Sequence, residues 1–443
     1  MLGNIQIKFE YQSTLMEATL PMSEYLGSFC PQFNTQPHNH LVLLHKALKQ
    51  PIGDISPILT RKKSRLSNIL IVLSDSFRYT GIEKILQEFL YYLYEHGFQS
   101  ENIRFAIATG AHRPPSEEEL INIMSHSVYS EFRSKIVIPS PTNLDEYSFI
   151  GNTSRNTPIY IHKSVMESEL IILTGTIVFH YFAGFGGGRK SLVPGLSALP
   201  TIQHNHTLSI HPETQYLHPN VKLGKMEKNP VAEDMLEATQ MIDKPIITLN
   251  TVLSPDKKIV GIFFGELVQA HKEGIKLART IYETPIPEKA DIVIANAGNV
   301  KNYLQSHKAL VNAWLARKEP HGRIILIAPS IEGIGGYRFE NWLEIKDVKK
   351  LVDKMTKEGE VNGQTVVSTI EKSPYTYFLT EMSESEVELL GGKKIKTLEE
   401  GFQLATEELA KNGITHPKWL YLPFASYSVP VTSSSHPVQY WNS

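Results

Sequence analysis

The sequence predicts an α/β protein with two α/β domains, mostly parallel sheets and an active-site cleft between the domains. Short apolar runs alternate with segments of helical periodicity, which is typical of parallel sheets covered by helices. A chain of 443 residues is long enough for two or three domains. The alternation starts afresh near Ala290, after a Pro-containing stretch. A cleft between two such domains is a common ligand site.

Each expected strand is a short apolar run bounded by loop residues. Ile69–Leu73 opens the series, and apolar residues at helical spacing between Ile82 and Leu93 follow it. A second expected helix, Leu304–Arg317, separates two strands of the second domain. The other expected strands are Phe105–Ala108, Ile136–Ile138, Leu170–Leu173, Asp291–Ala295 and Ile324–Ala328.

The expected domain organisation follows from this series. Residues 1–275 are expected to form an N-terminal cofactor-binding catalytic domain, and residues 285–425 a C-terminal α/β substrate-closing domain. The boundary lies in the stretch 265–289, a helix that ends in a Pro-containing segment. Residues 426–443 form a tail without a clear period, and the sequence does not place it.

Composition and charge exclude several classes of protein. The formal net charge is -2, with 44 basic and 46 acidic residues, so a general nucleic-acid or membrane-surface binder is not expected. A single cysteine, Cys30, excludes an internal disulfide and a cysteine-rich metal site. The N-terminus lacks the pattern of a signal peptide, and no apolar stretch of about 20 residues could span a bilayer. The cytoplasm is therefore the expected compartment.

The strongest local signal is a glycine-rich run, Phe182–Ser191, after the last expected strand of the first domain. Successive glycines such as Gly187 and Gly188 let backbone amides approach a phosphate, and Arg189 and Lys190 supply positive charge. The run nearly matches a P-loop, but Arg189 stands where a P-loop has glycine. A flexible turn is the ordinary alternative, whereas the paired charges favour anion binding.

Histidines gather around this run. His180 precedes it, and His204, His206 and His211 follow it. Two residues apart, His204 and His206 would share a face of a strand but not of a helix. Zinc is the usual metal for histidine ligands, and the sequence does not name the metal. Solvent-facing or hydrogen-bonded core histidines are the ordinary alternative.

His112 follows the expected strand Phe105–Ala108, so it should project from the carboxyl end of the sheet. His180 comes from the end of a different strand, and the two imidazoles could face each other. Groups that titrate near neutral pH can remove a proton on one side of a substrate centre and add one on the other. Racemisation needs this two-sided chemistry. The ordinary alternative is that His112 belongs to a plain connection from a strand through a turn to a helix and has no catalytic role.

Two pairs of polar residues are candidates for substrate or cofactor contacts. Asp75 and Arg78 follow the strand Ile69–Leu73, where a carboxylate suits ribose hydroxyls and a guanidinium suits a carboxylate or phosphate. The ordinary alternative is a surface ion pair. Gln305 and Lys308 share one face of a helix, where such residues are usually just solvated.

Taken together, these residues resemble the lactate racemase family, whose members use a nickel-pincer nucleotide. The matching motifs occur in the same order and cover roughly residues 75–342. They are Asp75-x-x-Arg78, Thr109–Arg113, His180, Phe182–Lys190, Asn205-His206, Gly224, Asn229-Pro230 and Gln305-x-x-Lys308 followed by Ala-Leu.

The resemblance implies how a cofactor would be held. Lys190 would carry it covalently, as pyridinium-3-thioamide-5-thiocarboxylic acid mononucleotide with nickel. His206 would bind the nickel and complete the S-C-S donor set of the pincer. The remaining contacts implied are Asp75 with the ribose, and Gly187, Gly188 and Arg189 with the phosphate.

The resemblance also implies the reaction. His112 and His180 would be the two general acid/bases, and Arg78 and Lys308 would hold the substrate carboxylate with Gln305 close by. The family mechanism takes the hydride of a 2-hydroxy acid onto the pincer, passes through a 2-keto acid and returns the hydride to either face. Cofactor-biosynthesis proteins of the host are the implied partners.

Two departures from the family pattern border the expected substrate. Leu304 stands where the family usually has tyrosine, and Tyr303, about 100° away on a helix, cannot substitute for it. Ser76-Phe77 precedes Arg78 where the family favours polar residues, and no proline follows. One alternative is therefore a racemase for a larger or more apolar acid than lactate. The others are a nucleotide- or phosphate-binding enzyme or sensor, and a relative without cofactor that only binds.

Overall fold

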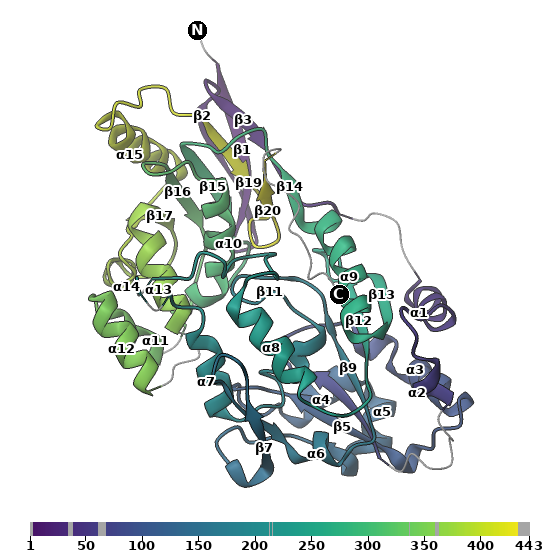
Figure 1. The fold of residues 1–443 in the computed structure, drawn as a ribbon. Coiled ribbons are helices and arrows are strands. Elements are labelled where there is room, and N and C mark those ends of the chain that lie inside the picture. The colour runs from purple at the N-terminus through teal and green to yellow at the C-terminus, as the bar shows by residue number, and fades with distance from the viewer. Residues whose placement is uncertain are drawn as a thin grey trace. The chain divides into compact units, whose positions relative to one another are not determined.

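The structure is a computed structural model that describes residues 3–33, 39–60, 68–211, 213–214, 216–335, 337–358 and 363–432. It divides into two compact units, each with its own six-stranded sheet (Figure 1). The first unit consists of Phe33–Ser209 and His218–Ile281. The second consists of the described residues of Met1–Gln32, Ile210–Leu217 and 282–432. The predicted α/β class with mostly parallel sheets is confirmed.

The sheet of the first unit has the order β13-β12-β9-β4-β5-β6, and only the pair β12–β13 is antiparallel. Its strands are β4 (Ile69–Ser74), β5 (Ile103–Ala108), β6 (Ile136–Val137), β9 (Leu170–Thr176), β12 (Ile246–Leu253) and β13 (Ile259–Glu266). Two antiparallel pairs lie outside it, β7 (Tyr147–Asn152) with β8 (Pro158–His162), and β10 (Phe179–His180) with β11 (Gly184–Phe185).

Helices cover both faces of this sheet, which explains why its strands read as continuous apolar runs. Along β4, Ile69 and Ile71 belong to one hydrophobic cluster, whereas Leu70 and Val72 belong to another. The helices are α1 (His40–Lys49), α2 (Ser56–Thr60), α3 (Leu86–Glu95), α4 (Glu117–Met124), α5 (His126–Phe132), α6 (Lys163–Glu167), α7 (Leu199–Thr207), α8 (Pro230–Gln240) and α9 (Leu267–Tyr282).

The sheet of the second unit is parallel throughout and has the order β18-β17-β16-β15-β19-β3. Its strands are β3 (Tyr25–Ser28), β15 (Ile292–Asn296), β16 (Arg323–Ile327), β17 (Thr376–Leu379), β18 (Lys393–Ile395) and β19 (Trp419–Leu422). Its helices are α10 (Tyr303–Ala316), α11 (Tyr337–Leu343), α12 (Val348–Glu358), α13 (Gly363–Lys372), α14 (Glu384–Leu390) and α15 (Leu398–Ala410).

The N-terminal segment and the tail differ from the expected domain organisation. The hairpin of β1 (Asn4–Tyr11) and β2 (Thr14–Pro21) precedes β3, and β3 extends the sheet of the second unit rather than the first. Within the expected tail 426–443, strand β20 (Val429–Val431) pairs with β14 (Glu283–Pro285), and residues 433–443 lie outside the described part. Among the described residues, no helix has the length and hydropathy needed to cross a bilayer.

Candidate active site

Two loops meet at the carboxyl end of the first unit's sheet because β4 and β5 are parallel neighbours with Ser74 opposite Ala108. Asp75 leaves β4 and is buried, and its Oδ2 accepts a hydrogen bond of 2.6 Å from Nδ1 of His112, which follows β5. The other carboxylate oxygen lies 3.7 Å from Nη1 of Arg78 and has no hydrogen-bond partner among the described residues. The sequence placed these residues at one sheet edge but did not predict the Asp75–His112 pair.

This hydrogen bond decides how His112 can act. A carboxylate only accepts, so Nδ1 of His112 carries the proton and Nε2 of a neutral ring is left with its lone pair. About a third of the imidazole side chain is exposed. His112 is therefore arranged as a base, with a buried carboxylate that would stabilise the imidazolium.

The glycine-rich loop follows β9 and is held by a side chain from β12. Gly187 and Gly188 have φ of +77° and +54°, which favour glycine. The amide of Gly188 donates to Oδ1 of Asn250 at 3.1 Å, and a Cβ on Gly187 would lie 3.1 Å from that oxygen. The loop therefore needs glycines both for its conformation and for its close approach to β12.

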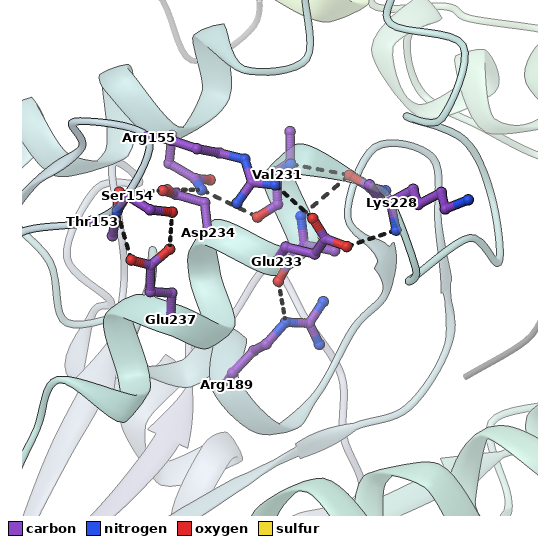
Figure 2. A network of polar contacts seen from close by, with 12 residues as sticks. Thr153, Ser154, Arg155, Arg189, Lys228, Val231, Glu233, Asp234 and Glu237 are labelled. Atoms are coloured by element: carbon purple, nitrogen blue, oxygen red, sulfur yellow. Dashed lines mark hydrogen bonds and ion pairs between the residues drawn. The ribbon is translucent and has the colours of Figure 1, made fainter. Parts of the chain in front are cut away.

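Arg189 points away from solvent, toward main-chain carbonyls. Its guanidinium donates to the carbonyl of Ala183 at 3.1 Å and to that of Ala232, in α8, at 3.3 Å. Figure 2 shows this second contact beside the polar network of α8. Arg189 thus ties the glycine-rich loop to α8, and a contact with a cofactor phosphate stays a prediction.

Lys190 lies against the ring of Phe182, with Nζ 5.0 Å from the ring centroid. Its side-chain amine has no carboxylate partner and no hydrogen bond among the described residues. Burial, followed by the charges of Arg78 and Arg189, holds the pKa of the Lys190 amine well below its usual value. A neutral amine is nucleophilic, so Lys190 is suited to form a covalent bond.

Two histidines contact the same Phe182 ring. The ring centroid of His180 lies 4.3 Å from that of Phe182, and the centroid of His206 lies 4.8 Å away. The amide of Ala183 donates to Nδ1 of His180 at 3.4 Å, which leaves the proton of the neutral ring on Nε2. Phe182 was part of a predicted motif, but its position between three candidate residues was not predicted.

His206 is buried in α7, and its Nδ1 has no hydrogen-bond partner among the described residues. Burial, followed by the Lys190 charge, lowers the pKa of His206 to about 3, although the carbonyl of Ile202 acts in the opposite direction. The imidazole is therefore neutral at physiological pH, the form that binds a metal. A buried nitrogen without a partner calls for a ligand or another explanation.

His204 does not join His206 in a pair on one strand face, as one interpretation of the sequence required. Both residues lie in the helix α7, where a spacing of two turns them to different sides. Nδ1 of His204 contacts the hydroxyl of Thr157 at 2.9 Å. The described residues contain no group of three or more His, Cys, Asp or Glu side chains that could hold a metal ion.

A buried carboxylate that the sequence did not single out holds α7 in place. Asp234, in α8, accepts hydrogen bonds from Asn205 at 2.8 Å and from Thr157 at 2.9 Å. Around it, Arg155 pairs with Glu233 at 2.6 Å (Figure 2). Asn205 immediately precedes His206, so this network sets the position of the candidate metal ligand.

The N-cap of α8 also reaches the Phe182 segment. The side chain of Asn229 caps α8 by accepting from two amides and donates to the carbonyl of Phe182 at 2.8 Å. One helix end therefore supports the glycine-rich loop, the Phe182 segment and α7. The motif Asn229-Pro230 was a signal for this role, because asparagine at the N-cap and proline at the next position are typical of a helix start.

The two candidates from the second unit lie on α10 and are exposed. Oε1 of Gln305 accepts from the amide of Lys301 at 3.0 Å, and Lys308 lies one turn further along. Tyr303 is fully buried and its hydroxyl contacts Thr369 at 2.9 Å, so it does not replace the family tyrosine, as expected. Leu304 packs partly buried against the core of this unit.

The structure thus brings together the candidates of the first unit. Three surround Phe182, and Arg78, beside Asp75, is close enough for its charge to lower the pKa of both Lys190 and His206. The arrangement offers an amine of lowered pKa, a buried imidazole without a partner for Nδ1 among the described residues, a partly exposed base and an exposed guanidinium. These groups could anchor a cofactor, ligate a metal, move a proton and bind an anion.

Comparisons with known proteins point to one family. Residues 11–216 match a family described as the lactate racemase N-terminal domain. The lactate racemase of Lactiplantibacillus plantarum is 31% identical over 359 residues, which are 79% of this chain and 81% of the relative. The lactate racemase of Thermoanaerobacterium thermosaccharolyticum is 30% identical over 324 residues, 72% of each chain.

Solved structures share the fold. The lactate racemase apoprotein from Thermoanaerobacterium thermosaccharolyticum matches with a TM-score of 0.85 at 24% identity, over 96% of this chain and 100% of that chain. A protein from Thermotoga maritima matches with a TM-score of 0.62 at 14% identity, over 91% of this chain and 100% of that chain.

Proposed function

The chain belongs to the lactate racemase family, and on this premise we propose that it is a 2-hydroxy-acid racemase or epimerase that carries a nickel-pincer nucleotide on Lys190. A racemase is an isomerase, and the protein is therefore assigned to that enzyme class. The observation that carries the proposal is the grouping of Lys190, His180 and His206 around the ring of Phe182. A small 2-hydroxy acid and the host's cofactor-biosynthesis proteins are the partners it requires.

The residues present fit the cofactor. Among the described residues the Lys190 amine has no ionic partner, and its pKa is lowered, so it can form the covalent bond. His206 is a neutral imidazole whose Nδ1 is buried without a partner in the described part of the chain. Asp75 would contact the ribose. Gly187 and Gly188 would let the loop approach the phosphate, with the amide of Gly187 facing it, since the amide of Gly188 donates to Asn250. When bound, the nickel-pincer nucleotide supplies the group that accepts and returns the hydride of the substrate carbon.

The chain's own residues orient the substrate. Arg78 is exposed at the carboxyl end of β4 and can pair with the substrate carboxylate through two parallel hydrogen bonds. Lys308, with Gln305 one turn before it on α10, is proposed as a further ligand of the substrate carboxylate.

His112 and His180 handle the hydroxyl proton. As C2 loses its hydrogen with the bonding electron pair, the hydroxyl proton passes to Nε2 of His112 and a 2-keto acid forms. Asp75 stabilises the resulting imidazolium. For the opposite face, an imidazolium form of His180 would give a proton to the oxygen that becomes a hydroxyl again and would be left as a neutral ring. His112 then releases its extra proton to solvent and His180 regains one from solvent. When the other enantiomer is bound the roles are exchanged, with a neutral His180 taking the hydroxyl proton and an imidazolium form of His112 returning one.

The buried imidazole of His206 argues against the rival from another class. A nucleotide- or phosphate-binding enzyme built on the near-P-loop needs no buried histidine whose Nδ1 lacks a hydrogen-bond partner among the described residues. A relative that only binds needs neither a base held by Asp75 nor a nucleophilic lysine.

The test is the loss of optical purity of single-enantiomer 2-hydroxy acids by protein purified from a cofactor-producing host. Removing a general acid/base typically costs about 10²–10⁴-fold, so His112→Ala and His180→Ala should each slow both directions by that factor. Nickel content and the mass of the adduct should stay as in the unaltered protein. Protein from a host without the cofactor is the control for background racemisation.

Near-normal activity of either variant would refute the two-base assignment. Absence of racemisation by fully loaded protein, together with tight binding of a nucleotide, would favour the rival class.

A further inference from the structure

An aromatic ring lies exposed beside the candidate base. Phe77 is 56% exposed, although its ring centroid is only 4.7 Å from that of His112. The residue immediately precedes Arg78, the expected ligand of the substrate carboxylate. An exposed aromatic side chain between a base and an anion-binding group is costly in water, because its apolar surface is not buried.

The ring has a second contact that holds it in place. The guanidinium of Arg113 lies 5.2 Å from the centroid of Phe77 and forms two hydrogen bonds of 2.7 Å with Glu119 of α4. Glu119 is itself fixed, because it forms the capping box of α4 with Ser116. The Phe77 ring therefore contacts two supported groups, His112 and Arg113, and its exposed surface can meet a ligand with little loss of side-chain freedom.

We propose that Phe77 contacts the substrate's side chain beyond the 2-carbon, and that the enzyme prefers 2-hydroxy acids with aromatic or large apolar side chains. This inference rests on the proposed racemase function. A carboxylate held by Arg78 and a hydroxyl facing His112 would place the side chain on C2 near Phe77, which contacts His112 and precedes Arg78 in the chain. An apolar group there removes the exposed surface of Phe77 from water, whereas a methyl group covers little of it.

The experiment compares 3-phenyllactate with lactate as single enantiomers, using loaded protein and optical purity as the readout. The unaltered enzyme should have the higher kcat/KM for 3-phenyllactate. Because one matched methylene already changes kcat/KM about 10–200-fold, Phe77→Ser should lower the ratio of the two kcat/KM values by at least about 10-fold. Phe77→Tyr keeps the ring and should keep most of the ratio.

Tyr79→Ser is the matched control. Tyr79 is also an exposed aromatic of the same loop, but it contacts Glu83 and Lys84 rather than His112. Its removal should leave the ratio within about 2-fold. Nickel content and adduct mass, measured for every variant, confirm that the cofactor site is intact, and Phe77→Leu replaces Phe77→Ser if the serine variant does not fold.

The ratio separates the possible outcomes. If Phe77 only supports His112, its removal slows both substrates alike and the unchanged ratio overturns the proposal. A preference for lactate in the unaltered enzyme also overturns it while leaving the racemase function intact. If loaded protein racemises neither acid nor any branched aliphatic one, the proposed function fails, and this inference fails with it.

Discussion

Each unit packs a lysine against an aromatic ring, and the two lysines differ in what else they touch. Nζ of Lys190, in the first unit, lies 5.0 Å from the Phe182 centroid, and Nζ of Lys372, in the second, lies 5.3 Å from the Trp314 centroid. Burial lowers the pKa of both amines. Lys372, however, forms an ion pair with Glu371, whereas Lys190 has two arginine charges near it and no carboxylate among the described residues.

The same contrast separates two buried histidines. Burial lowers the pKa of both His206 and His307 to about 3. Nε2 of His307 contacts the hydroxyl of Ser368 at 3.1 Å, whereas Nδ1 of His206 has no hydrogen-bond partner among the described residues. A lowered pKa therefore marks burial in either unit, and the missing partner is what distinguishes the candidate site.

The largest expected effect is that of Lys190→Ala. Racemisation should fall to the level of protein that was never loaded, and the excess of the intact mass over the sequence mass should disappear. Lys372→Ala removes a lysine that also packs against an aromatic ring but already has a partner, so it should keep the adduct. An unmodified Lys190 in active protein from a cofactor-producing host would contradict the comparison, as would an adduct on Lys372.

The second effect concerns the metal. His206→Ala should abolish the nickel that co-purifies at up to one atom per chain, because the imidazole is its protein ligand in this proposal. His307→Ala should retain nickel while lowering the free energy of unfolding by about 2–4 kcal/mol, through a lost hydrogen bond and a cavity. Elemental analysis and thermal unfolding provide the two measurements. Stoichiometric zinc that survives His206→Ala would show that the metal binds elsewhere.

The smallest effect is on the stability of the protein without cofactor. Lys190→Met should raise the free energy of unfolding at neutral pH by about 1–3 kcal/mol, because it removes a buried polar group without a partner. The folded pKa of Lys190 lies below the unfolded value of 10.5, so folding releases a proton between the two values. The loss of folding stability caused by the Lys190 amine is therefore largest at low pH and decreases as the pH rises toward 10.5.

The gain in the free energy of unfolding that Lys190→Met gives over the unaltered protein should therefore become smaller as the pH rises. Denaturant unfolding of both proteins at several pH values measures this gain. Lys372→Met is the control variant. This change also breaks the ion pair with Glu371, so it should raise the free energy of unfolding by less than Lys190→Met does. An advantage of Lys190→Met that grows with pH would contradict the lowered pKa.

Local patterns predicted the fold class well. The run Ile69–Leu73 is a continuous apolar stretch because both faces of its strand are covered, so the sequence was enough to predict a buried strand there. The strand β3 was not predicted, nor was its membership of the second unit. It pairs with β19, nearly the whole chain away, and no local periodicity reports a partner at that distance.

Most of the candidate site could be recognised in the sequence, but its contacts could not. Lys190 and His206 were singled out by motif spacing, and the structure adds that Phe182 lies against both. Asp234 gave no signal, because a single aspartate in a helix is usually exposed. Its burial and its bond to Asn205 exist only once α7 and α8 have packed together.

By itself, the sequence determined the alternation of strands and helices and the residue types at the strand ends, because periodicity, capping and loop composition act over a few neighbouring residues. Only the tertiary structure decided which of those residues have partners. The Asp75–His112 hydrogen bond joins two loops, and Arg189 turns to carbonyls rather than to solvent. Hydrogen-bond and ion-pair partners depend on register and packing between elements that are distant in the chain. For the same reason, only the tertiary structure shows that, among the described residues, the Lys190 amine has no carboxylate partner and Nδ1 of His206 has no hydrogen-bond partner.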